Sequence, residues 1–148
     1  MVNAALVGRA FPPTPAYLVG REKIREFARA VFASNPVYLD VDVARAAGYP
    51  DLVAPPTFPI VLQQRTLEQL LAEPDAELDF SRVVHGDQRF SYSRPVVAGD
   101  ELTAQLSVTS IKSLGGNSMV TSESIITDAS GAHVVTAIST LVVRGADA

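Results

Sequence analysis

Residues 31–58 read VFASNPVYLDVDVARAAGYPDLVAPPTF and hold most of the residue types that fix the backbone of this 148-residue chain. An Asn-Pro pair ends one predicted helix, and either Asp40 or Asp42 can cap a short second helix. A proline-rich loop then leads into a long apolar helix that begins near Pro59. The stretch therefore predicts the end of one helix, a short second helix and a loop that leads into a central helix. We expect the ligand site in this stretch.

Two segments on either side of the short helix have helical periodicity. The first begins at Arg21, and its apolar residues recur at positions i, i+3, i+4 and i+7: Ile24, Phe27, Ala28 and Val31. The second follows Pro59 and reads IVLQQRTLEQLL, which is apolar nearly all round in its first turn and one-sided later. Such a helix is buried at one end and emerges at the other, so we expect it to be the central helix of the fold.

The second half of the chain has strand periodicity almost to its end. Alternation of apolar and polar residues predicts strands over residues 89–93, 102–108, 119–127 and 134–143, after a short strand at 17–19. The phase shifts at Ser110-Ile111, which indicates a bulge, and the LGGN sequence at 114–117 is typical of a hairpin turn. Helices followed by hairpin-linked strands predict an α+β fold with an antiparallel sheet.

The order N-P-V-Y-x-D from Asn35, then A-x-A-A-G-Y and A-P-P-T-F, resembles the signature of the MaoC-like (R)-specific enoyl hydratases and hydroxyacyl dehydratases of the hotdog superfamily. HGDQRF at 85–90 and RPVVAGD at 94–100 look like the strand and turn of the FAS1-like dehydratase N-terminal domain. The match covers nearly the whole chain and is closest to the HadA-type subunits of (3R)-hydroxyacyl carrier-protein dehydratases. It implies a single hotdog domain over residues 1–148, in which an antiparallel sheet wraps around a long central helix.

The chain departs from this signature where the family carries its chemistry. In the family, Gly-Asp precedes x-Asn-Pro, and an apolar residue and a His follow; here these Gly, Asp and His positions hold Phe32, Ala33 and Tyr38. Hydration of an α,β-unsaturated thioester needs a base that takes a proton from water and an acid that protonates the α-carbon, and an Asp/His pair supplies both. An alanine methyl supplies neither, and a protonated phenol is at most a hydrogen-bond donor. We therefore predict no catalytic residue and expect the isolated chain to be inactive.

The loop before the central helix is a second departure. In catalytic hotdog subunits, backbone N–H groups at the N-terminus of this helix point at the thioester carbonyl and stabilise an enolate-like oxygen. Proline has no N–H group, so Pro55, Pro56 and Pro59 remove three of these donors. The amides of Thr57 and Phe58 are the two that we expect to remain.

The resemblance to HadA-type subunits implies a chain that shapes an acyl site while a partner subunit with the Asp/His pair does the chemistry. The expected ligand is a 3-hydroxyacyl or enoyl thioester of acyl carrier protein or coenzyme A, with no cofactor and no metal ion. Its expected contacts are Asn35, Tyr38, Thr57, Phe58, Ile60, His85 and Gln88. We expect a homodimer or a heterodimer, joined through residues 89–93 or the last strands, because an unpaired edge strand is a template for pairing.

The sequence leaves other functions open. A self-sufficient hydratase or thioesterase would need a non-standard site, and Glu68 is the one acid in the middle of the central helix, in its polar phase. The two imidazole bases are His133, in a polar turn, and His85. Asp87 follows His85 by two residues and should share its strand face, but the pattern favours a structural or ligand-contacting role for His85 over catalysis. A non-enzymatic acyl-binding module is the remaining alternative.

Composition excludes several other classes of function. The absence of cysteine excludes disulfides, thiolate nucleophiles and Cys-ligated zinc. A net charge of −4 argues against nucleic acid as the main partner, and no stretch approaches the ~20 apolar residues of a membrane span. With 47% hydrophobic and 19% charged residues, the chain has the balance of an ordinary globular protein, and we expect it to be cytoplasmic.

Overall fold

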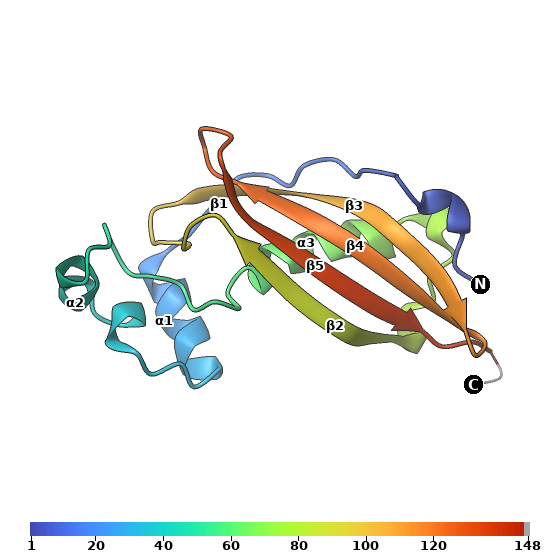
Figure 1. The fold of residues 1–148 in the computed structure, drawn as a ribbon, viewed down its shortest axis with the longest axis horizontal. Coiled ribbons are helices and arrows are strands. Elements are labelled where there is room, and N and C mark those ends of the chain that lie inside the picture. The colour runs from blue at the N-terminus through green and yellow to red at the C-terminus, as the bar shows by residue number, and fades with distance from the viewer. Residues whose placement is uncertain (147–148) are drawn as a thin grey trace.

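The computed structural model describes residues 1–146 and contains a five-stranded antiparallel sheet (Figure 1). Its strands are β1 (Tyr17–Leu18), β2 (Val83–Tyr92), β3 (Glu101–Leu114), β4 (Asn117–Thr127) and β5 (His133–Val143). They lie in the order β1-β3-β4-β5-β2. Hairpins join β3 to β4 and β4 to β5, and β2 pairs with the outer side of β5.

The helices are α1 (Arg21–Ala30), α2 (Val41–Ala46) and α3 (Ile60–Leu71). Figure 1 shows α3 lying across one face of the sheet, α1 and α2 beyond one end of the strands, and the N-terminus and the end of β5 at the other end. Asp40 is the residue that caps α2, because its Oδ1 accepts hydrogen bonds from the amides of Asp42 and Val43 at 2.9 and 3.3 Å. None of the helices within residues 1–146 has both the length and the apolar character that crossing a bilayer requires.

The strands confirm the predicted bulge and hairpin turn. The register of β3 against β4 shifts between Val108 and Ser110, next to the position where the alternation of the sequence changes phase. Gly115 and Gly116 have φ angles of 57° and 80°, the left-handed conformations of a two-residue hairpin turn. The turn therefore sets the register of the two longest strands.

The inner face of the sheet packs against α3 to form the core. Alternate residues of β3 and β4 are buried on this face, and the apolar stripe of α3 lies against them. The buried set on β3, β4 and α3 includes Leu62, Leu67, Leu70, Leu102, Ala104, Leu106, Val120 and Ile126. Burial of each large apolar side chain contributes about 2 kcal/mol. The predicted α+β architecture, an antiparallel sheet around a long helix, is confirmed.

β2 is an open edge of the sheet. It pairs with β5 alone, whereas β5 is hydrogen-bonded to both β4 and β2. The last strand is therefore interior, and the prediction that it could be a seam between subunits is wrong. Residues 89–92 of the other predicted seam lie on the open edge.

Candidate functional site

The position at which the family signature has Asp lies just beyond the end of α1. Phe32 has a φ of 57°, and the amides of Phe32 and Ala33 donate to the carbonyls of Arg29 at 3.2 Å and Ala28 at 2.8 Å. These two bonds form a Schellman motif, whose left-handed position is usually Gly. Phe32, at the Gly position of the signature, therefore adopts the left-handed conformation that glycine favours, and the Asp position holds the half-buried Ala33.

The Asn-Pro turn that follows is fixed by its own asparagine. Asn35 Oδ1 accepts a hydrogen bond from the Val37 amide at 3.1 Å and begins the 3-10 turn Pro36–Tyr38. Arg25 of α1 donates to the carbonyl of Leu39 at 2.9 Å, on the other side of this turn. These contacts set the position of Tyr38, the residue that stands where the signature has His.

The proline loop is tied to the sheet and to itself. The Tyr92 hydroxyl, at the end of β2, donates to the Pro56 carbonyl at 2.6 Å. The Phe58 amide donates to the Pro55 carbonyl at 2.9 Å, so the expectation that this amide remains free is wrong, because the loop turns back on itself. Thr57 has the remaining amide, which makes no hydrogen bond to any residue in the range 1–146.

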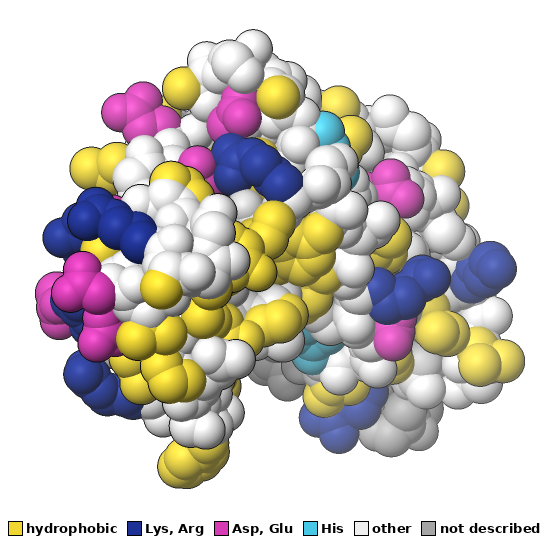
Figure 2. Space-filling model, turned by 60° about the vertical axis from the view of Figure 1, so that its left-hand side comes forward, with side chains coloured by type: hydrophobic (Ala, Val, Ile, Leu, Met, Phe, Trp, Pro, Cys, Tyr) yellow, Lys and Arg dark blue, Asp and Glu magenta, His cyan; other side chains and the backbone are white. Residues whose placement is uncertain are grey.

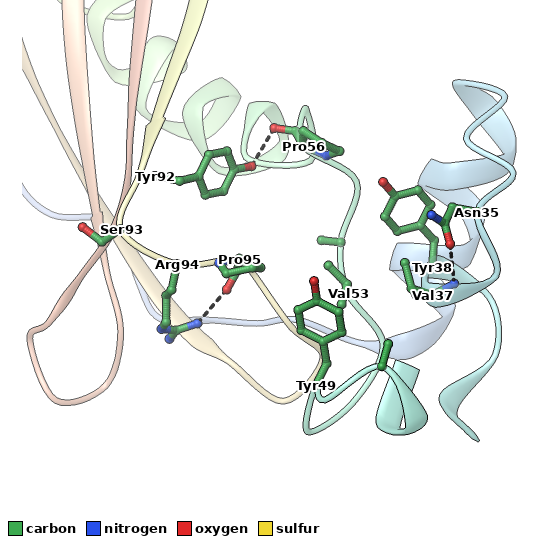
Figure 3. Close-up of a pocket in the computed structure, with 12 residues that line it drawn as sticks. Asn35, Val37, Tyr38, Tyr49, Val53, Pro56, Tyr92, Ser93, Arg94 and Pro95 are labelled. Carbon is green, nitrogen blue, oxygen red and sulfur yellow. Dashed lines mark hydrogen bonds between the residues drawn. The ribbon is translucent and has the colours of Figure 1, made fainter. Parts of the chain in front are cut away.

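A cavity of about 600 Å³ lies between this segment and the end of the sheet, within the usual range for small-molecule sites. Figure 2 shows hydrophobic side chains gathered in a hollow on this side of the molecule. In Figure 3, Tyr38 and Tyr49 stand on the helical side and Tyr92 on the sheet side. The lining residues are Asn35, Val37, Tyr38, Ala47, Tyr49, Val53, Ala54, Pro56, Tyr92, Ser93, Arg94 and Pro95. None of these residues is Asp, Glu or His, so they offer no general base for neutral pH.

The polar groups of the cavity are neutral or paired. Burial raises the pKa of the Tyr92 phenol well above its usual value, and the nearby Tyr38 adds to the shift, so Tyr92 stays protonated and donates. The charged group of the lining is the Arg94 guanidinium, which binds Asp100 at 2.9 and 3.1 Å and Asp128 at 3.2 Å. Because these carboxylates neutralise the guanidinium, the cavity favours an uncharged ligand.

His85 and Asp87 lie on opposite faces of β2. The register against β5 shifts between them, so Gly86 is the extra residue of a β-bulge. His85 Nε2 lies 3.2 Å from Oγ of the buried Ser139, whereas the Asp87 carboxylate lies 3.3 Å from Nε of Arg89. The expectation that His85 and Asp87 share a face is wrong, because the bulge reverses the alternation between them.

Two of the expected ligand contacts, Asn35 and Tyr38, line the cavity. Phe58 is fully buried in the core, where its ring lies edge-on to Phe27 with a centroid distance of 5.4 Å. The other four expected contacts lie at the start of α3 or further along β2: Thr57, Ile60, His85 and Gln88. Asn35 and Tyr38 of the Asn-Pro turn thus line the cavity, whereas no lining residue belongs to the central helix α3.

Four polar lining residues were not predicted from the sequence: Tyr49, Tyr92, Ser93 and Arg94. The alternation of β2 could have indicated Tyr92, since it faces the same way as the half-buried Phe90. Arg94 stands in the RPVVAGD sequence and Tyr49 ends the A-x-A-A-G-Y sequence, but neither sequence by itself indicated that these side chains contact a ligand. Glu68 is exposed on α3 and lies outside the cavity.

Comparison with known sequences gives a consistent result. The family model described as FAS1-like, dehydratase domain region, matches residues 5–137. The chain is similar to a UPF0336 protein of Leifsonia xyli subsp. xyli, with 73% identity over 144 residues that cover 97% of each chain. It is 52% identical over 146 residues to a UPF0336 protein of Streptomyces avermitilis, which covers 99% of this chain and 97% of the relative.

Comparison with solved structures points to the same group. The chain is similar to a chain of the C-terminally truncated HadBC (3R-hydroxyacyl-ACP dehydratase) complex from Mycobacterium tuberculosis, with a TM-score of 0.80, 34% identity, and 90% and 92% of the two chains covered. A MaoC-like dehydratase matches with a TM-score of 0.86 and 35% identity over 97% of this chain and 43% of that one. A chain of the ChsH1-ChsH2 complex from Mycobacterium tuberculosis shares the fold at 23% identity, with a TM-score of 0.72 over 93% of this chain and 98% of that one. The sheet curled around α3 is the hotdog fold of the HadBC-like dehydratases.

Proposed function

The chain belongs to the family of FAS1-like dehydratase domains, and from this premise we propose that it is the acyl-chain-binding, non-catalytic subunit of a (3R)-hydroxyacyl thioester dehydratase or enoyl hydratase. A partner subunit with an intact Asp/His pair supplies the chemistry. One observation carries the proposal: a cavity lies beside the degenerate signature, and its lining residues include no carboxylate and no imidazole.

The missing groups are those that the reaction needs. Addition of water to the double bond requires a base to activate the water and an acid to protonate the α-carbon. Ala33 can do neither, and the hydroxyls of Tyr38 and Tyr92 can donate hydrogen bonds. The cavity can therefore hold and orient a ligand but has no acid–base pair of its own.

The character of the cavity fits an acyl thioester. Its walls are largely valine, alanine, proline and tyrosine, and Asp100 and Asp128 neutralise the guanidinium of Arg94. An uncharged chain with a thioester group would bury apolar surface there at about 25 cal/mol per Å². The ligand would be a thioester of acyl carrier protein or of coenzyme A.

The open edge of β2 supports a partner at this site. Tyr92 is both the last residue of β2 and a lining residue of the cavity. A second hotdog subunit that paired with β2 would therefore lie beside the cavity and could bring a catalytic pair to its mouth. The HadBC dehydratase, which this chain resembles, is a complex, and a homodimer through the same edge is the other form of this pairing.

The first test is hydration of trans-2-enoyl-coenzyme A by the purified chain alone and after co-expression with a hydratase-like protein that has the intact signature. We expect activity in the mixture only, and none when the Asp and His of that partner are replaced. Activity of the chain alone, abolished by Tyr38→Phe or His85→Ala, would overturn the proposal in favour of a self-sufficient hydratase with a non-standard site. Release of free coenzyme A by the chain alone would instead indicate a thioesterase.

A binding experiment tests the cavity itself. Ala47 lines the cavity and Ala46 precedes it on the exposed end of α2. Ala47→Trp should fill part of the cavity and weaken binding of an acyl-coenzyme A probe at least tenfold, measured by calorimetry, whereas Ala46→Trp should leave it unchanged. Equal affinities for the two variants would show that the ligand binds elsewhere.

A further inference from the structure

Tyrosine is concentrated at the cavity. The chain has four tyrosines, and three of them, Tyr38, Tyr49 and Tyr92, line this site. They come from separate segments: Tyr38 from the Asn-Pro turn, Tyr49 from the loop after α2 and Tyr92 from the end of β2. The fold thus brings three phenol hydroxyls from distant parts of the sequence to a cavity whose walls are otherwise largely apolar.

The three hydroxyls differ in the hydrogen bonds that they make. The Tyr92 hydroxyl donates to the Pro56 carbonyl at 2.6 Å, so its one proton is not available to a ligand. The hydroxyls of Tyr38 and Tyr49 make no hydrogen bond to any group of residues 1–146, and in Figure 3 both point from the helical side toward the cavity. The cavity therefore has two unused hydroxyl donors on its helical side.

The other polar side chains of the lining are less suited to bind a ligand. Arg94 gives its terminal N–H groups to two carboxylates and a backbone carbonyl. The Ser93 hydroxyl points away from the cavity in Figure 3 and is hydrogen-bonded to Nδ1 of His133. Asn35 stands on the far side of Tyr38 from the sheet (Figure 3). The two free phenols are therefore the donors that a ligand in the cavity would meet.

A thioester carbonyl needs such donors once it leaves water. Its oxygen gives up hydrogen bonds to water on entering an apolar cavity, and this loss is unfavourable unless the site replaces them. The loop before α3 does not replace them, because Pro55 and Pro56 have no N–H group and the Phe58 amide is bonded to the Pro55 carbonyl. Thr57, whose amide is unbonded, is not a lining residue. This loop thus offers the cavity no amide.

We propose that the hydroxyls of Tyr38 and Tyr49 bind the carbonyl oxygen of the thioester, in place of backbone amides at the start of the central helix. A carbonyl oxygen has two lone pairs and can accept a hydrogen bond from each phenol. The inference rests on the proposed acyl-binding function and adds the group by which the ligand is recognised. A thioester is held by its carbonyl, whereas a chain without a carbonyl has only apolar contacts in the cavity.

The test compares an acyl-coenzyme A thioester with the S-alkyl-coenzyme A thioether of the same chain length, which lacks the carbonyl. Both are titrated into the full chain by calorimetry, and the natural sequence should bind the thioester more tightly. Tyr38→Phe and Tyr49→Phe should each weaken binding of the thioester roughly fivefold, as expected for the loss of one hydrogen bond. Both variants should bind the thioether as tightly as the natural sequence does.

Tyr17→Phe is the matched control, because Tyr17 lies outside the cavity on β1, where its ring packs against the guanidinium of Arg65. Its affinities for both compounds should equal those of the natural sequence. If Tyr38→Phe does not fold, Tyr49→Phe carries the test. Unchanged affinity of the cavity variants for the thioester, or an equal loss for the thioether, would overturn the carbonyl assignment and leave the proposed function intact. Failure of the natural sequence to bind either compound would overturn both.

Discussion

The hydroxyl of Tyr92 donates a hydrogen bond to the carbonyl of Pro56, 2.6 Å away, and so joins the end of β2 to the loop that precedes α3. This bond closes one side of the cavity (Figure 3). Tyr92→Phe should lower the free energy of unfolding by about 1 kcal/mol, the usual net value of one hydrogen bond. Urea unfolding followed by circular dichroism measures this change.

Tyr49→Phe is the control for the Tyr92 experiment. Tyr49 also lines the cavity, but its hydroxyl makes no hydrogen bond within residues 1–146 of the structure, and its loss should leave the unfolding free energy nearly unchanged. Equal effects of the two substitutions would mean that the Pro56 bond does not hold the loop.

The elements that depend on local physics could be predicted from the sequence. The spacing of apolar residues predicted α1 and α3. The Asn-Pro pair was expected to end the first helix, but α1 ends earlier, at Ala30, and the pair begins the short turn that Asn35 caps. The sequence left Asp40 and Asp42 as alternative caps of α2, because both are chemically suitable and the choice depends on where the first helical turn begins. Ala33 and Tyr38 stand where the family signature has Asp and His, and the sequence therefore predicted a site without an acid–base pair. The residues that line the cavity include no Asp, Glu or His.

The features that were missed depend on contacts between distant segments. The bulge at Gly86 is invisible in the alternation of β2, because it appears only in the register against β5. The exclusion of β5 as a seam required the strand order, which local patterns do not contain. The position of Phe58 inside the core was likewise set by its packing against Phe27 of α1.

Phe32 occupies a conformation that suits glycine. Its φ is 57° and its side chain is 93% exposed, so the ring adds almost no burial to offset the left-handed backbone. Phe32→Gly should therefore stabilise the protein by about 1 kcal/mol, seen as a higher urea midpoint with an unchanged slope. Phe32→Ala keeps the strained conformation and should change little. A loss of stability in Phe32→Gly would show that the exposed ring makes a contact of its own, as in a complex with a partner.

The hydrogen bonds of Asp128 should make stability depend on pH in the acid range. A hydrogen bond from the Ser130 hydroxyl, with help from Arg94, lowers the pKa of Asp128 from 3.8 to about 2. Because the folded pKa is the lower one, this stabilisation is complete above the unfolded pKa and is lost as the pH falls from about 4 through about 2. Asp128→Asn should thus lower the melting temperature at pH 7, and the difference should close as the pH approaches 2.

The control for the acid titration is Glu101→Gln, since Glu101 is exposed and makes no ion pair within residues 1–146. Its melting temperature should follow that of the natural sequence at each pH. A gap between Asp128→Asn and the natural sequence that stayed constant down to pH 2 would mean that the carboxylate charge of Asp128 is not what stabilises the turn.

Gly86 should be the least replaceable residue of β2. A Cβ there would lie 3.1 Å from Cγ2 of Val142 and 3.3 Å from the carbonyl oxygen of Thr140, so Gly86→Ala must shift the edge strand or its neighbour. We expect a loss of about 1 to 2 kcal/mol in the free energy of unfolding, typical of an added methyl in a packed site. Gly20→Ala adds the same methyl with no atom within 4 Å and should cost much less. If Gly86→Ala is as stable as Gly20→Ala, the bulge adapts to a side chain, and His85 and Gln88 would not be held together on the inner face of the sheet by the glycine.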